Sequence, residues 1–408
     1  MNQSAKGKSP FYPGQPVPVE LFVGRGEQID HIISRGVRQV KEGKPVTIYV
    51  QGEYGIGKSS IAGYVQYLAE QEYGLHSIYA PLGAAETLED VGAAVLEATL
   101  RSGAFDPRRS EKVRNWLAKY IGEQSLSGFV TIHAEALKND APSIASGMLP
   151  FLSEVLARLQ DTGVNGIFLV FDEINGISAN PKFAHFLKSL VDSNSYTFSK
   201  TPLPLLLMLC GVEERRMEMI KKHQPVERIF DVVEIGVMSE KEMENFFTRA
   251  FDSVQIKVNE DAMKLFTHYS AGFPKIMHLV GDAAYWSDND GIIDEDDAFR
   301  ALFIAAEDVG RKYVDQQVYN ALKSQDYRSI LKKIAATGLD NESFLKAEVE
   351  KHLNDNEKNK FNNFLQKMKK LKVLRSGDIR GQYIFNMRMV YFYIWMQSVI
   401  RQSAGEHP

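Results

Sequence analysis

Short apolar runs alternate with segments of helical spacing over the first part of the chain. Five runs rich in β-branched and apolar residues lie at positions 46–51, 76–82, 166–171, 203–210 and 229–235. A continuous apolar run of this length is typical of a strand buried on both faces. Because helical patterns separate the runs, we predict an α/β fold, a parallel sheet covered by helices on both faces. The long stretch 86–160 predicts several further helices and includes the segment 126–137.

The pattern changes at Ser239, after which helical spacing continues to Val309 without strand-like runs. Ser239 followed by Glu242 has the form of a capped helix start. The DNDG sequence at 288–291 predicts a turn,. We therefore expect a small helical lid domain over residues 239–311.

The last part of the chain has a third character. Helical patterns over 326–336, 344–353 and 358–371 precede a stretch with strand-like ends and a Gly-Asp centre, at 373–385. Short helices followed by such a hairpin predict a winged helix over 312–408. The apolar run 389–400 is too short to span a bilayer and predicts a buried final helix,. We expect residues 1–19 to form a tail and residues 20–238 to form the α/β core.

Composition bounds the class of protein. The hydrophobic fraction of 44% and the charged fraction of 25% are those of a soluble globular protein, and 408 residues predict two or three domains,. The single cysteine, Cys210, excludes an internal disulfide and a cysteine zinc cluster, which fits a reducing cytosol,. Since the N-terminus lacks the apolar segment of a signal peptide, we expect a cytoplasmic protein without a membrane partner.

The net charge of −4 is distributed unevenly. From Lys312 to Arg401 there are 17 Lys and Arg against 9 Asp and Glu, a net charge of +8, which leaves −12 for the rest of the chain. A basic C-terminal part on an acidic body fits a polyanion or an acidic partner at that end. A solvated lysine-rich surface explains the same charge equally well.

A phosphate-binding loop follows the first predicted strand. Residues 52–59, GEYGIGKS, have the spacing GxxxxGK[ST], and helical spacing follows them,. Glycines let the backbone N–H groups turn toward a phosphate chain, and the helix that starts at Lys58 adds its positive dipole end. Lys58 is expected to reach the β- and γ-phosphates, and Ser59 to hold Mg²⁺. The predicted nucleotide contacts here are Gly52, Glu53, Tyr54, Gly55, Ile56, Gly57, Lys58, Ser59 and Ser60.

Two acids end the third predicted strand. In IFLVFDE at 167–173, Asp172 suits the Mg²⁺ shell, and Glu173 suits the orientation and polarisation of the attacking water,. The plain alternative is that the strand simply ends in two acids that face solvent. The phosphate loop upstream favours a catalytic role for the two acids. No NKxD sequence occurs in the chain, which favours ATP over a guanine nucleotide.

The order of these motifs resembles the AAA+ superfamily, and within it the origin-initiator-like and STAND-like branch. The resemblance covers roughly residues 21–400 and rests on FVGR at 22–25, the phosphate loop, FDE at 171–173, an apolar fourth strand, Arg228 before the fifth strand, and GFPK at 272–275. It implies an AAA+ core with a helical lid and a winged helix. It also implies ATP and Mg²⁺ as ligands and assembly into homo-oligomers with ATP at the subunit interfaces.

The resemblance also assigns roles to single residues. It places Val23, Gly24 and Arg25 near the adenine. Arg228 resembles an arginine finger offered to a neighbour's γ-phosphate, with Arg215 and Arg216 as rivals, while a surface ion pair is the plain explanation for each. Lys275 matches a lid position often held by arginine, and a lysine keeps the charge but loses the planar fork.

One position departs from the family pattern. The fourth strand ends at Cys210-Gly211, where the family usually has a polar residue that positions water. A cysteine here is better explained as a small core residue. We therefore expect slow hydrolysis, which suits a switch better than a motor.

Three functions remain open at this point. The first is an ATP-dependent switch that oligomerises and controls an effector protein encoded elsewhere, as resemblance to bacterial defence systems and transposition modules implies. The second is a DNA-binding initiator or loader ATPase acting on duplex DNA. Its expected contacts are Lys358, Lys360, Asn363, Lys367 and Lys370 on a recognition helix, with Arg375 and Arg380 on the wing,. The third, a nucleotide-bound structural protein without turnover, is disfavoured by Glu173.

Overall fold

The chain folds into two compact units. The computed structural model describes residues 6–103, 106–121, 147–195, 201–335, 343–377 and 379–403. One unit, the core unit, comprises Pro16–Gly236, and the other, the helical unit, comprises Met1–Gln15 together with Val237–Pro408. The chain therefore passes between the units twice. The division into a tail, a core, a lid and a winged helix stays a prediction.

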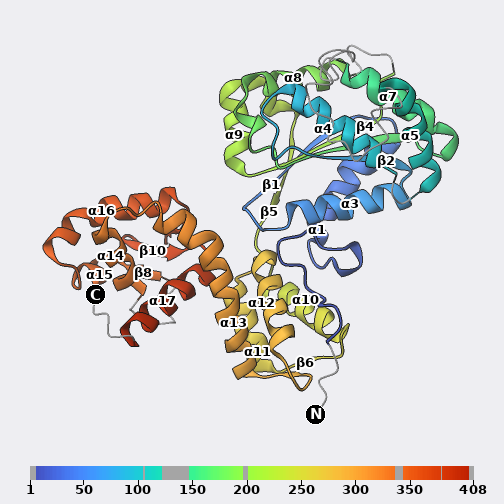
Figure 1. The fold of residues 1–408 in the computed structure, drawn as a ribbon. Helices are drawn as coiled ribbons and strands as arrows, with labels where there is room; N and C mark the ends of the chain where they lie inside the picture. The colour runs from blue at the N-terminus through green and yellow to red at the C-terminus, as the bar shows by residue number, and fades with distance from the viewer. Residues whose placement is uncertain are drawn as a thin grey trace. The chain divides into compact units, whose positions relative to one another are not determined.

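A five-stranded parallel sheet forms the centre of the core unit (Figure 1). Its strand order is β2-β3-β4-β1-β5. The strands are β1 (Val46–Gly52), β2 (Leu75–Pro81), β3 (Gly166–Asp172), β4 (Leu205–Gly211) and β5 (Asp231–Ile235). Every residue of β3 and β4 is buried, as expected for strands covered on both faces,. The five predicted strands are confirmed.

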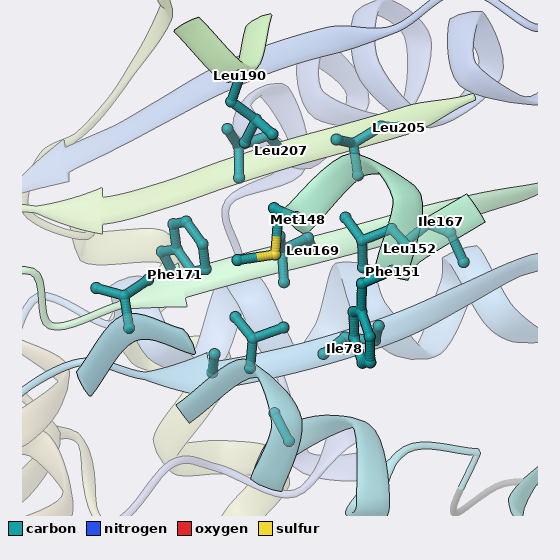
Figure 2. Packing of buried hydrophobic residues seen from close by; sticks show 14 of the residues in the cluster. Ile78, Met148, Phe151, Leu152, Ile167, Leu169, Phe171, Leu190, Leu205 and Leu207 are labelled. Atoms are coloured by element: carbon teal, nitrogen blue, oxygen red, sulfur yellow. The ribbon is translucent and has the colours of Figure 1, made fainter. Parts of the chain in front are cut away.

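Alternate residues of the strands build a core on each side of the sheet. Ile167, Leu169 and Phe171 of β3 face the larger cluster, which the helices of the long insertion cover (Figure 2). These helices are α4 (Leu88–Arg101), α5 (Pro107–Ile121) and α7 (Met148–Leu159), joined by α8 (Pro181–Ser193). On the opposite face, a Cβ at Gly36 would lie 2.8 Å from Ile48, so a helix packs closely there. The predicted segment 126–137 lies outside the described residues.

The opposite face is covered by helices close to the phosphate loop. The first is α1 (Gly26–Ile32), which continues through a π-helical turn (Ile33–Val37) into α2 (Arg38–Lys41). The second is α3 (Lys58–Glu72), whose Tyr64 stacks on Phe22 with ring centroids 4.6 Å apart. The core unit also contains α9 (Glu213–Lys222) and a 3₁₀ helix, Gln224–Ile229, between β4 and β5.

Four helices make the first part of the helical unit: α10 (Glu240–Asp252), α11 (Glu260–Ser270), α12 (Pro274–Ser287) and α13 (Glu295–Val309). The predicted cap is confirmed, because Ser239 and Glu242 form a reciprocal capping box,. The expectation of no strands is wrong in one detail. The two-residue strands β6 (Lys257–Val258) and β7 (Ile292–Ile293) pair in parallel and join the loops before α11 and α13.

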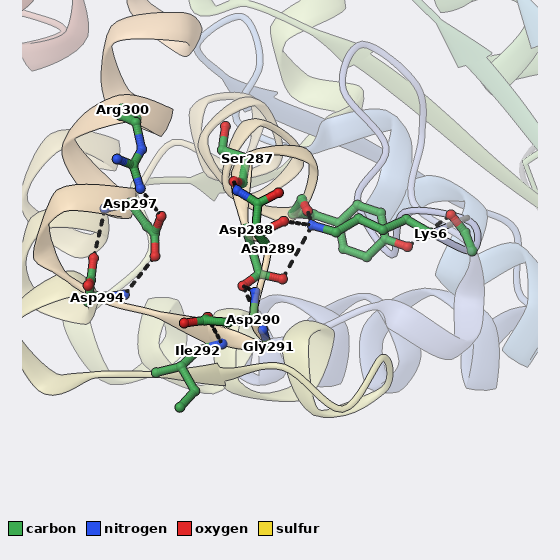
Figure 3. Close-up of polar contacts among 12 residues, drawn as sticks. Lys6, Ser287, Asp288, Asn289, Asp290, Gly291, Ile292, Asp294, Asp297 and Arg300 are labelled. Carbon is green, nitrogen blue, oxygen red and sulfur yellow. Dashed lines mark hydrogen bonds and ion pairs between the residues drawn. The ribbon is translucent and has the colours of Figure 1, made fainter. Parts of the chain in front are cut away.

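The N-terminal segment is a strap fastened to these helices. Lys6 Nζ donates to the carbonyls of Tyr285 and Asp288, and Figure 3 shows Lys6 directed at the turn 288–291. The turn itself is confirmed, since Asp288 Oδ1 accepts from Gly291 N at 2.9 Å. Farther along the strap, Ser9 Oγ donates to Asp282 Oδ1 at 2.6 Å. Residues 6–12 are therefore an ordered part of the helical unit.

Phe11 is the apolar anchor of this strap. It is 4% exposed, and its ring centroid lies 4.9 Å from that of Phe251 and 5.9 Å from that of Phe246. The ring lies against Gly281 of α12, where a Cβ would come within 2.2 Å of it. Beside it, the backbone N–H of Tyr12 donates to His278 Nδ1 at 3.2 Å.

The last part of the helical unit has the element order of a winged helix. The elements are α14 (Gln325–Ala335), β8 (Ser343–Leu345), α15 (Lys346–Glu350), α16 (Asp355–Lys370), β9 (Leu374–Ser376) and β10 (Gln382–Phe385). The strands form an antiparallel sheet in the order β8-β10-β9, which confirms the hairpin. The helix predicted to start at Phe344 is wrong at this residue. Phe344 lies in β8, where its ring stacks on Tyr383 of β10 with centroids 5.7 Å apart.

The chain ends with α17 (Arg388–Ser403), the predicted buried helix. Its residues from Met389 to Ile394 are all buried, and Phe392 contacts Tyr269 of α11 with ring centroids 4.9 Å apart. In the part of the chain that the structure describes, no helix has both the length and the apolar character needed to cross a membrane.

Candidate functional site

The phosphate loop lies between the carboxyl end of β1 and the start of α3. β1 ends at Gly52 and α3 begins at Lys58. Gly55 and Gly57 have φ values of 77° and 100°, a conformation that favours glycine,. Ile56, only 2% exposed, anchors the loop to the core. Strand, glycine loop and helix thus occur in the arrangement that the motif requires.

Lys58 lies over the inner side of its own loop. Its Nζ donates to the carbonyls of Gly52 and Glu53, both at 2.8 Å, and lies 5.5 Å from the centroid of the Tyr54 ring. Burial lowers the pKa of this ammonium, while Asp172, Glu53 and Glu173 oppose the shift,. The positive charge of this partly buried ammonium is the feature that would favour an anionic phosphate, which could replace the two loop carbonyls as its partner,.

Tyr79 links the two predicted magnesium ligands. Its hydroxyl donates to Asp172 Oδ2, and Asp172 is 5% exposed at the end of β3. Burial first, then the charge of Asp172, raises the pKa of Tyr79, while a hydrogen bond with Ser59 lowers it. Ser59 and Asp172 are therefore both near this one hydroxyl. The sequence prediction missed Tyr79, whose only signal is its place on β2, two residues before the strand ends.

Glu173 follows β3 at the same edge of the sheet. The residue is exposed and has a φ of 55°, a strained value for a side chain that is not glycine,. Its Oε2 lies beside Gly83, where a Cβ would come within 2.6 Å of it. Asp172 Oδ1 accepts from Glu173 N at 2.9 Å and fixes the turn. Both acids are thus held at the carboxyl ends of the strands.

Arg25 connects the FVGR segment to the phosphate loop. Gly24 and Arg25 have positive φ values of 78° and 66°, and Arg25 is 5% exposed. Its Nη2 donates to the carbonyl of Ile56 at 3.2 Å. The preceding chain also contacts α3, because Val17 N donates to Ser60 Oγ at 3.4 Å. Val23 is half-buried, and adenine contact by Val23, Gly24 and Arg25 stays a prediction.

Arg228 lies at the opposite edge of the sheet. It is exposed in the 3₁₀ helix before β5, where it lines a cleft of about 490 Å³ with Val46 and Thr47 at the start of β1. β1 runs from Val46 to Gly52, so a strand length of about 20 Å separates this cleft from the phosphate loop of the same chain,. Arg228 therefore cannot reach a nucleotide at the phosphate loop of its own chain, and its contact with a neighbouring subunit's nucleotide stays a prediction.

Arg215 and Arg216 lie at the nucleotide edge instead. α9, which carries them, starts two residues after β4 ends. Arg216 Nε donates to Gln51 Oε1 at 3.0 Å, one residue before the loop. Arg215 Nη1 pairs with Glu218 Oε2 at 2.8 Å. Arg216 thus lies against the residue that precedes the phosphate loop of its own chain.

Two further predicted residues lie in β4 and in α12. Cys210 is fully buried in β4, and burial raises the pKa of its thiol, so it has the character of a core residue,. Lys275 is exposed at the second position of α12 in the helical unit. Its phosphate contact stays a prediction. In the described part of the chain, no group of three or more His, Cys, Asp and Glu side chains could hold a metal ion. Coordination of Mg²⁺ by Ser59 and Asp172 stays a prediction.

Comparison with solved structures agrees with this geometry. A Walker-type ATPase of Pyrococcus abyssi superposes with a TM-score of 0.55 at 15% identity, covering 92% of this chain and 96% of that one. The ORC2 protein of Aeropyrum pernix, in ADPNP–ADP complexes, superposes with a TM-score of 0.57 at 12% identity, covering 97% of each chain. At these identities the likeness shows the fold. The chain thus has the predicted α/β fold, in which the phosphate-loop motif follows the first strand of a parallel sheet.

Neither a family model nor a curated protein matches the sequence.

Proposed function

We propose that this chain is an ATP-binding and ATP-hydrolysing switch of the AAA+ type that acts in the cytoplasm. One observation carries the proposal: the phosphate loop, the Ser59–Tyr79–Asp172 group and Glu173 all lie at one edge of the sheet. The Aeropyrum pernix ORC2 protein was solved with ADPNP and ADP, which supports a nucleotide at the corresponding edge here.

The residues divide the chemistry between them. The loop N–H groups and Lys58 bind the β- and γ-phosphates, and Ser59 and Asp172 hold Mg²⁺. The metal ion, when bound, neutralises charge on the phosphate oxygens. Glu173 orients and polarises the attacking water. Arg228 of a neighbouring subunit stabilises charge on the transferred phosphoryl group, and Lys275 of the helical unit contacts the same phosphate.

We expect slow ATP turnover because of the residue near the end of β4. The strand ends with a buried thiol at Cys210 instead of a polar side chain that could position water. A long-lived ATP state is what a switch requires. We propose that this state assembles a homo-oligomer and controls an effector protein encoded elsewhere, in bacterial genome defence.

The test is ATP turnover by the purified protein with matched variants. Lys58→Ala should abolish nucleotide binding, because it removes the phosphate-binding ammonium. Glu173→Gln should bind ATP but retain it, which light scattering would detect as a stabilised oligomer. Lys222→Ala, an exposed change at the end of α9, is the control for turnover. Hydrolysis by Glu173→Gln at the wild-type rate would contradict the role of Glu173.

A DNA-binding initiator, loader or transposition ATPase is the second candidate, favoured by the winged-helix element order and the basic charge. Two of the expected contacts already have partners within the chain: Lys360, which is exposed, pairs with Asp326, and Lys367 donates to the carbonyl of Ala321. The other candidates on α16 and the hairpin, Lys358, Asn363, Lys370, Arg375 and Arg380, are exposed as well.

Charge reversal tests this candidate. If the surface contacts duplex DNA, Lys370→Glu with Arg375→Glu should weaken binding at low salt and reduce its salt dependence by about two phosphate contacts. Lys264→Glu on α11 is a charge-matched control away from the winged-helix elements. Unchanged affinity and unchanged turnover with DNA would favour the switch with a protein partner.

A further inference from the structure

The strap, residues 6–12, lies in a groove that belongs to a distant part of the sequence. The groove is formed by α10 and α12, which supply Phe246, Phe251, His278 and Asp282 to it. The hydrogen bonds between strap and groove join residues that are 266 to 282 positions apart. Since the groove does not include the neighbours of the strap in sequence, the strap of a second copy of the chain can make the same contacts.

The groove is closely matched to the sequence of the strap. Gly281 leaves room for the ring of Phe11, since a Cβ there would come within 2.2 Å of it. Tyr285 donates from its hydroxyl to the carbonyl of Gly7 at 2.9 Å, and the ammonium of Lys6 pairs with the buried carboxylate of Asp288 (Figure 3). An empty groove would expose the aromatic rings of α10 to water. A groove that loses its own strap is therefore best filled by another strap of the same sequence.

A tight turn follows the strap and connects it to the core unit. Gln15 N donates to the carbonyl of Tyr12 at 3.4 Å, and Gly14 has a φ of 79°. With Pro13 at the second position and glycine at the third, the residues are those of a type II turn. The chain is next held at Val17, in the core unit. One long hydrogen bond thus closes the turn, and opening it would let the strap leave its groove with residues 6–12 unchanged in conformation.

We propose that straps are exchanged between copies of this chain, so that in the homo-oligomer each strap occupies the groove of a neighbouring subunit. The inference rests on the proposed function, which supplies the oligomer, and adds the way in which its subunits are joined. Exchange conserves every contact of the strap. Its equilibrium therefore depends on the turn 12–15 and on the effective concentration of the second groove, which assembly raises.

Cross-linking between two new cysteines tests the exchange. Cys210, the single native cysteine, is fully buried, so a short bismaleimide would join the thiols of Ser9→Cys and Asp282→Cys, where two oxygens now lie 2.6 Å apart. For full-length oligomer that carries both changes, we expect denatured bands at two or more times the mass of one chain. Co-expressed subunits with one change each should give a two-chain band. Phe11→Ala in the Ser9→Cys subunit is the control and should remove that band, because the strap loses its anchor.

The turn offers a second variant that leaves the groove intact. A Cβ at Gly14 would meet no atom within 4 Å, so Gly14→Ala acts through the positive φ alone,. Because this strains the closed turn, we expect the ratio of interchain to intrachain links to rise about fivefold.

The outcomes separate the exchange from the proposed function. An oligomer that contains intrachain links alone, both with the two cysteines only and with Gly14→Ala added, would overturn the exchange and leave the proposed function standing. Interchain links in a protein that binds no nucleotide would refute the proposed function alone. A protein that stays monomeric with ATP would refute both.

Discussion

The hydroxyl of Tyr79 on β2 donates a hydrogen bond to Asp172 Oδ2 at the end of the neighbouring strand β3. Removing it by Tyr79→Phe leaves the buried carboxylate of Asp172 without this donor. Since groups that orient a metal ligand are typically worth tenfold or more in metal affinity, we expect the Mg²⁺ concentration for half-maximal ATP binding to rise about tenfold. Nucleotide binding without Mg²⁺ should change little. A Mg²⁺ titration identical to wild type would contradict this role for Tyr79.

Arg25 should support the phosphate loop from behind. Arg25→Ala removes the bond from the guanidinium to the carbonyl of Ile56 and opens a gap at a buried position. We expect ATP and ADP affinity to fall together, by about tenfold, because the loop N–H groups lose their fixed orientation. The measurement is calorimetric titration with both nucleotides. Arg35→Ala, an exposed change in the following helical segment, should leave both affinities as they are.

Phe11 should carry much of the stability of the strap. Phe11→Ala removes a ring that is 4% exposed among Phe246, Phe247 and Phe251. Losses of this kind cost about 3–5 kcal/mol, so the strap and α12 should exchange amide hydrogens far faster than in wild type. Gln15→Ala, an exposed change just beyond the strap, is the control. Unaltered exchange in α12 would show that the ring contributes little.

The helical unit should lose stability in acid through His278. Burial lowers the pKa of His278 to about 4, whereas the pKa of a histidine in an unfolded chain is about 6.5. Between these values the unfolded chain binds a proton that the folded chain does not. Stability should therefore fall as the pH drops from about 6.5 to about 4, by up to about 3 kcal/mol.

Amide exchange in α12, corrected for the intrinsic pH dependence, measures this effect. Wild type should lose protection between pH 7 and pH 5. His278→Gln, which does not titrate, should lose less over the same interval. The same pH dependence in both proteins would assign the acid sensitivity to other groups.

The sequence predicted the elements whose signals are local. The loop 52–59 and the acids Asp172 and Glu173 follow apolar strands directly, and their spacing alone identifies them. The strand order and the placement of Tyr79 could not be predicted this way, since they depend on the register of β2 against β3. Phe344 was assigned to a helix because its neighbours have helical spacing, but pairing with β10 decides its conformation.

The partners of long charged side chains could not be predicted from the sequence either. Lys360 and Lys367 have the spacing of a solvent-exposed face, yet one pairs with Asp326 of α14 and the other with a carbonyl before it. Arg228 was preferred as the arginine for a contact across subunits, with Arg215 and Arg216 as its rivals. Only their elements, α9 and the 3₁₀ helix before β5, show which edge of the sheet each arginine occupies. Partners of flexible side chains are set by tertiary packing, which spacing does not encode.

The strap shortens one of the two connections between the units. It is anchored at Tyr12 in the helical unit, and the chain is held again at Val17 in the core unit. The second connection runs from the end of β5 at Ile235 to Met238, whose N–H donates to the carbonyl of Gly272. Loss of the strap's contacts would therefore lengthen the first connection by several residues and leave the second as it is.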